Sequence, residues 1–152
     1  GIKQSSAHNQ PLRIAGVLMA VYGLVGILWP LAPMHQRDVL AAGGGTVSDT
    51  LHLVMAMVSS LFMTFAMGFG AAAFTGRFRI YSIVTIIMLC VFAVLTSVDA
   101  PNVEKNLPTP FLGIIERIMI GVFLLWVVVL SLILLKKTSP VSPHRTAHKP
   151  KF

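Results

Sequence analysis

Residues 111–135 read FLGIIERIMIGVFLLWVVVLSLILL, and Glu116 and Arg117 are the only charged residues in this run. A helix needs roughly 20 residues to cross about 30 Å of hydrocarbon. The run is continuously apolar instead of alternating, and it stops at Lys136 and Lys137. This pattern predicts a transmembrane helix and argues against a barrel strand.

Three further apolar runs precede this one, at residues 12–32, 51–74 and 80–98. Of the whole chain 55% is hydrophobic and 11% is charged, and the mean hydropathy is +0.81. A soluble domain has about 25% charged residues, because water must cover its surface. We therefore expect an all-α fold, a transmembrane four-helix up-and-down bundle over residues 12–135, with short loops.

The basic residues lie mainly on the side of this bundle that carries both ends of the chain. The opposite side has only Arg37, Lys105 and Arg117. By the positive-inside rule we expect both termini in the cytoplasm. Residues 1–11 would form a cytoplasmic segment, and residues 136–152 a basic, disordered cytoplasmic tail.

The net charge of +7 does not indicate a nucleic-acid partner. The basic residues flank the apolar runs and do not form a stripe interleaved with aromatic residues. The single cysteine, Cys90, excludes a disulfide within the chain. The expected partners are membrane lipids and other transmembrane helices or subunits. The first run also has a face of small residues, which we expect to be a helix-packing face: Gly16, Ala20, Gly23 and Gly26.

A polar cluster is predicted at the end of the bundle opposite the termini. It comprises the charged and histidine residues of the two outer loops and of the adjacent helix ends: His35, Arg37, Asp49, His52, Asp99, Glu116 and Arg117. Asp49 and His52 are three residues apart and share one helix face. That face continues through small and polar residues, so His52 should point into the bundle; they are Ala56, Ser59, Met63 and Gly70.

Charged groups inside an apolar helix normally find partners in the protein interior. We expect Glu116 to pair with Arg37 or with a protonated His52. Arg117 would pair with Asp49 or Asp99, so that a charged network joins the two outer loops. Such a network would either clamp the helix ends together or line a binding or catalytic pocket.

No cofactor is expected. His35, His52, Asp49, Asp99 and Glu116 are acceptable metal ligands, but no HExxH or HxxxH motif is present. His52 alone could ligate a pigment or a haem. Ser48 lies four residues before His52 without a nucleophile-elbow motif, so hydrolysis is not favoured.

Several strings together resemble a bacterial membrane family known as domain of unknown function 998. They are Pro33 to Arg37, Asp49 to His52, Phe78 to Ser82, and Pro108 to Gly113 with Glu116 and Arg117. The resemblance covers Arg13 to Leu135. It implies a multi-pass protein of the bacterial cytoplasmic membrane, usually of six helices, with no assigned activity, so it assigns no catalytic residue. It also implies that two upstream helices are missing here, split off, or replaced by a partner. The matching positions are Met34, His35, Arg37, Asp49, His52, Arg79, Tyr81, Glu116 and Arg117.

Taken together, the sequence favours a non-enzymatic integral membrane component. It would be a structural or accessory component that packs against partner helices and lipid in a larger assembly, with the polar cluster as a clamp. The alternative is a membrane enzyme or transporter-like protein. In that case the polar pocket would act on a lipid-derived or small substrate.

Overall fold

The computed structural model describes residues 9–105 and 107–138, and the fold is all-α, as predicted. Its elements are α1 (Gln10–Ile27), η1 (Trp29–Leu31), α2 (Arg37–Ala41), α3 (Val47–Ala73), α4 (Arg77–Glu104) and α5 (Leu112–Thr138). Most of the tail expected at 136–152, and nearly all of the segment expected at 1–11, lie outside the described residues.

Four of these helices are long and apolar enough to cross a membrane. They correspond to the four predicted spans, but each begins or ends a few residues away from the predicted bounds. The largest difference is in α4, which continues past the predicted end at Val98 to Glu104, through Pro101. Proline lacks the backbone N–H and its ring clashes with the carbonyl four residues earlier, but here this disturbance falls at the last turn of α4. The four helices fit a multi-pass membrane protein.

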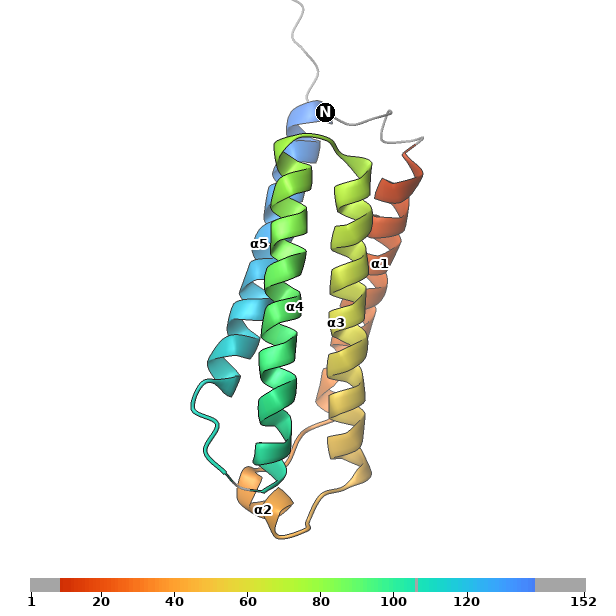
Figure 1. Cartoon of the computed structure of the whole chain (residues 1–152). Coiled ribbons are helices and arrows are strands. Elements are labelled where there is room, and N and C mark those ends of the chain that lie inside the picture. Colours follow the sequence, from red (N-terminus) through yellow and green to blue (C-terminus); the bar gives the residue numbers. More distant parts are fainter. Residues whose placement is uncertain (1–8, 106, 139–152) are drawn as a thin grey trace, which may run out of the picture.

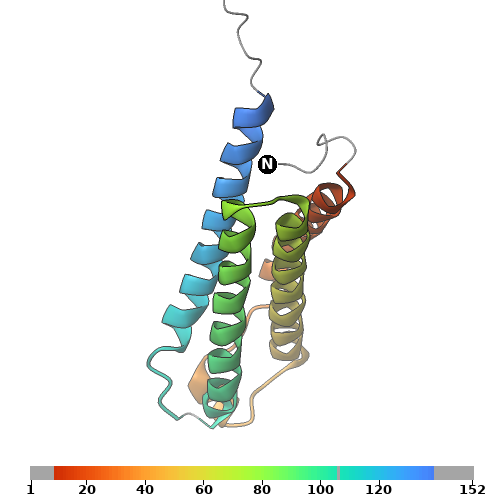
Figure 2. The ribbon, with the colours of Figure 1, turned by 45° about the horizontal axis from the view of Figure 1, so that its top comes forward.

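The long helices alternate in direction, so the described chain starts and stops at the same end of the bundle (Figure 1). We call this the terminal end; the short turn between α3 and α4 also lies there. The opposite end, the loop end, carries η1, α2 and the connection between α4 and α5. Both ribbon views show α4 between α5 and α3, with α1 on the other side of α3 (Figure 2).

Polar side chains define where the helices begin. Asn9 accepts a hydrogen bond from the backbone N–H of Leu12 and so caps α1. Its amide also donates to the carbonyl of Ala73 at 3.1 Å, which ties the start of α1 to the end of α3. Gly76 follows with φ +71°, a backbone conformation that glycine adopts without strain, and this allows the short turn into α4.

The main cluster of buried apolar side chains lies in the terminal half of the bundle. Phe74, Phe123 and Trp126 are almost completely buried there. Trp126 donates from Nε1 to Ser82 Oγ at 2.9 Å, which satisfies its only polar group. Gly70 faces the indole so closely that a Cβ there would lie 2.5 Å from Trp126 Cζ2. The small-residue face predicted on α3 is therefore a packing face, as expected.

The corresponding prediction for α1 is wrong as far as contacts within this chain are concerned. Gly16, Gly23 and Gly26 have no atom within 4 Å of an added Cβ, and Ala20 is exposed. The physical reason is that α1 turns larger side chains, including Met19 and Tyr22, toward the core. Its small-residue face consequently points outward.

Candidate functional site

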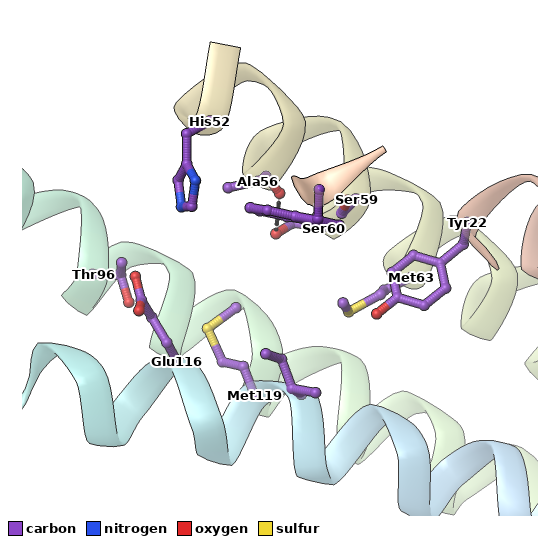
Figure 3. A pocket seen from close by; sticks show the side chains of 11 residues that line it. Tyr22, His52, Ala56, Ser59, Ser60, Met63, Thr96, Glu116 and Met119 are labelled. Atoms are coloured by element: carbon purple, nitrogen blue, oxygen red, sulfur yellow. Dashed lines mark hydrogen bonds between the residues drawn. The ribbon is translucent and has the colours of Figure 1, made fainter. Parts of the chain in front are cut away.

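A cavity of about 420 Å³ lies between the long helices on the loop-end side of the aromatic core (Figure 3). Its volume falls within the range of small-molecule sites, about 300–1,000 Å³. We call it the loop-end cavity. It is lined by Tyr22, Trp29, His52, Ala56, Ser59, Ser60, Met63, Thr96, Glu116, Met119 and Ile120.

His52 is held in a defined orientation at this cavity. Its Nδ1 lies 2.8 Å from the carbonyl oxygen of Ala32, directly after η1. Trp29 packs against its ring edge to face, with the centroids 4.8 Å apart. Because a carbonyl oxygen only accepts hydrogen bonds, the proton belongs on Nδ1, and Nε2 of the neutral ring is left as an acceptor. The expectation that His52 points into the bundle is confirmed.

Glu116 enters the cavity from the first turns of α5, facing α3 and α4 (Figure 3). Within the described residues nothing forms a hydrogen bond or an ion pair with its carboxylate. Its side chain remains accessible, so the cavity is open beside it. A carboxylate on an apolar helix without a protein partner is expensive to keep in a membrane.

Two hydroxyl groups on the cavity wall are also without partners. Ser59 Oγ on α3 and Thr96 Oγ1 on α4 are buried and make no hydrogen bond within the described part of the chain. Ser59 is only 4% exposed. Ser60, by contrast, satisfies its hydroxyl on the carbonyl of Ala56 at 2.9 Å. A buried polar atom left unpaired costs about 1–3 kcal/mol, so two of them on one wall need an explanation.

The remaining walls are apolar or aromatic. Met63 and Met119 face the cavity from α3 and α5, and Tyr22 closes it from α1. The centroids of the Tyr22 and Phe123 rings are 5.1 Å apart. The cavity thus combines a few convergent polar groups with a flexible, apolar wall. This combination suits a ligand that has both a polar and an apolar part.

Asp49 belongs to a different cluster, which closes the loop end. Its first carboxylate oxygen, Oδ1, accepts a hydrogen bond from the backbone N–H of His35 at 2.7 Å. Its second oxygen, Oδ2, accepts one from the backbone N–H of Thr46 at 2.8 Å. His35 Nδ1 lies 2.9 Å from the second carboxylate oxygen and forms an ion pair with it when protonated. Thr46 is the N-cap of α3, so Asp49 fixes the start of α3 and the preceding loop together.

The predicted charged network between the outer loops is wrong. His35 with Asp49 is the one ion pair found in residues 9–105 and 107–138. Arg117 donates to the carbonyl of Gly113 on its own helix at 2.7 Å. Neighbouring helix positions are about 100° apart, which turns Arg117 away from the cavity that Glu116 lines.

The two outer loops are nevertheless joined, by hydrogen bonds. Arg37 at the start of α2 donates to the carbonyl of Leu107 at 3.3 Å and to the hydroxyl of Thr109. The guanidinium therefore connects the first outer loop to the α4–α5 connection. Asp99, which was predicted to belong to the same cluster, is half-buried on α4 and does not line the cavity.

Of the predicted cluster, the cavity gathers only His52 and Glu116. The sequence placed Ser59 on the inward face of its helix but did not mark it as a site residue, and it gave no sign of Thr96. A signal for Ser59 was present, since Ser59 is seven residues, or two turns, after His52 on the same face. Within the described residues no three His, Cys, Asp or Glu side chains come together as a metal site.

Comparison with known proteins places this geometry in a family. The family model described as "Protein of unknown function (DUF998)" matches residues 1–133, which include all of α1 to α4 and most of α5. The resemblance found in the sequence is thereby confirmed. No curated protein and no solved structure shows a significant similarity to the chain.

Proposed function

The chain belongs to the DUF998 family of proteins of unknown function, and we propose that it is an integral membrane protein that binds an amphiphilic, lipid-derived or small molecule in its loop-end cavity. This proposal rests on one observation: several polar groups without a protein partner line the same, mainly apolar cavity. Glu116, Ser59 and Thr96 all lack a hydrogen-bond partner in the described chain, and all three line the same space.

The unpartnered hydroxyl groups lower the stability of the protein when no ligand is bound. Each buried hydroxyl without a partner costs about 1–3 kcal/mol, and replacing it by an apolar group of the same shape is close to neutral or stabilising. A chain that served only as a helical clamp would gain stability by exchanging Thr96 for valine. A ligand that forms hydrogen bonds with these groups removes this cost, and this accounts for polar residues at these positions.

The test follows from this argument. In Thr96→Val the empty protein should be as stable as the wild type or more stable, and its affinity for added amphiphiles should fall. Thermal unfolding with and without a panel of single-chain and double-chain amphiphiles measures both effects. The matched control is Thr85→Val on the same helix. The Thr85 hydroxyl donates to the carbonyl of Tyr81 at 2.8 Å, and Thr85 does not line the cavity.

These two variants should move in opposite directions. Thr85→Val should lower the stability of the empty protein and leave the ligand-induced rise in Tm unchanged. A Thr96→Val protein that is less stable when empty, with an unchanged response to every amphiphile, would show that the hydroxyl is structural. The proposal would then be wrong.

A second function, as an accessory subunit, is favoured by the outward face of α1. Gly16 and Gly23 leave open space where another helix could approach closely, as small residues allow in membranes. Gly16→Leu and Gly23→Leu should then abolish association with partner helices, measured as the size of the native complex. Val17→Leu, at an exposed position beside this face, is the control.

We further propose that the termini lie in the cytoplasm of a bacterial cell, which places the cavity in the outer half of the membrane. The basic residues near the terminal end support this orientation. In a Cys90→Ser background, an impermeant thiol reagent added to intact cells should modify Gly44→Cys and spare Thr138→Cys. The reverse labelling pattern would show the opposite orientation.

A further inference from the structure

A second, smaller cavity of about 50 Å³ adjoins the loop-end cavity. It is lined by Thr64, Leu89, Cys90 and Ala93 together with three residues that also line the first cavity, Ser60, Met63 and Met119. The shared residues form the partition between the two spaces. Two of the three are methionines, whose unbranched side chains change rotamer at little cost.

The polar groups of the first cavity define what head group it can hold. When the proton of the His52 ring lies on Nδ1, toward the carbonyl of Ala32, Nε2 is an acceptor, and Glu116 offers a carboxylate without a protein partner in the described chain. The described lining contains no Lys or Arg. A head group that donates hydrogen bonds matches these acceptors, whereas an anionic head would face a like charge at Glu116.

The apolar groups define where the rest of the ligand lies. His52 is near the start of α3 and Met63 is three turns deeper, so the lining becomes more apolar away from the loop end. Beyond Met63 and Met119 the path continues into the second cavity and reaches Cys90, which is exposed on the outer surface of α4. This is a narrow route, suited to one hydrocarbon chain.

From this geometry we infer the ligand class of the proposed site. The ligand is a single-chain amphiphile with a hydroxyl or amine head. The head lies among His52, Glu116, Ser59 and Thr96, and the chain passes between Met63 and Met119 toward Cys90. This inference rests on the proposed binding function and adds the head chemistry and the path of the chain.

The experiment uses the full chain in lipid nanodiscs and two separate readouts. Trp29 borders the head site, so its fluorescence, read in a Trp126→Phe background, reports occupancy of that site. Cys90 is the only cysteine of the chain, so its rate of modification by N-ethylmaleimide reports the end of the path. The probes are dodecylamine, dodecanol, dodecanoate and the short-chain hexylamine.

Dodecylamine and dodecanol should change Trp29 fluorescence and slow the modification of Cys90. Because Cys90 is also exposed on the outer surface of α4, an occupied path should slow the modification of the thiol without stopping it. Hexylamine should change the fluorescence without protecting Cys90. Dodecanoate should bind much more weakly, and Glu116→Gln should reduce that difference. Arg117→Gln is the control, since this neighbouring side chain bonds Gly113 and does not line the cavity.

The outcomes distinguish a failure of the proposed binding function from a failure of the inferred ligand class. If no probe alters Trp29 fluorescence, the proposed binding function fails. If the long-chain probes alter it while Cys90 reacts at its original rate, the path of the chain is wrong although the site binds. If dodecanoate binds as well as dodecylamine, the inferred head chemistry is wrong. Met119→Phe, which narrows the partition, should retain the fluorescence change and lose the protection of Cys90.

Discussion

Replacing Gly70 by alanine tests the packing on which the bundle depends. A Cβ at this position would lie 2.5 Å from Cζ2 and 2.8 Å from Cη2 of Trp126, distances that real Cβ atoms do not show. The indole is fully buried and is held by its bond to Ser82, so it has no free space into which to move. Either the indole shifts or α3 moves away from it.

The size of the effect follows from three contributions. Forcing an extra methyl group into a well-packed core costs about 1–3 kcal/mol. Displacing the indole far enough to break its bond to Ser82 adds about 0.5–1.5 kcal/mol. Alanine is the better helix former by about 1 kcal/mol, which offsets part of this loss. We therefore expect Gly70→Ala to destabilise the protein by about 1–3 kcal/mol.

The same helix contains a matched control. Gly68 is two residues earlier, and a Cβ there would meet nothing within 4 Å. Gly68→Ala has the same gain in helix propensity without the clash, so it should be neutral or stabilising. Thermal unfolding of both proteins in one detergent, followed by tryptophan fluorescence, compares them directly.

A double variant shows whether the indole is the cause. In Gly70→Ala with Trp126→Phe the smaller ring leaves room for the methyl group, so the two changes together should cost less than the sum of the single changes. Additive costs, or a Gly70→Ala protein as stable as Gly68→Ala, would refute this account of the close contact between α3 and α5.

Three further substitutions test the connections at the two ends of the bundle. Asn9→Ala removes the cap of α1 and the bond to Ala73, and it should lower the free energy of unfolding by about 1–2 kcal/mol, measured as a lower Tm. Asp49→Ala should cost at least as much, because it leaves two backbone N–H groups without their acceptor; Asp38→Ala, at an exposed position of α2, should have almost no effect. Arg37→Ala should leave Tm nearly unchanged and speed proteolysis of the α4–α5 connection, since it releases Leu107 and Thr109; unchanged cleavage would contradict the connecting role of Arg37.

The sequence predicted the four helices because each apolar run is long enough to span hydrocarbon, and that signal needs no knowledge of tertiary contacts. It also placed His52 and Ser59 on an inward face, because the helical period alone determines which positions share a face. The cap that Thr46 and Asp49 form at the start of α3 also involves residues close together in the chain, which is the kind of contact that a sequence pattern can indicate.

Contacts between side chains and residues far apart in the sequence could not be predicted from the helical period. Arg117 was expected to pair with an acidic residue, but it donates to the carbonyl of Gly113 on its own helix. Arg37 was expected to pair with Glu116, and it bonds Leu107 and Thr109, about 70 residues away along the chain. Which of several polar groups meet depends on helix rotation and loop paths, which the hydrophobic pattern does not determine.

The aromatic core and the loop-end cavity occupy opposite halves of one bundle, so the two halves should differ in compressibility. Closely packed interiors resist compression, whereas applied pressure favours states with less internal void. Squeezing the molecule should thus collapse the region around His52 and Glu116 before it disturbs Trp126. A change in the lateral force exerted by the surrounding lipid should likewise deform the half that holds the cavity before the half that holds the aromatic core.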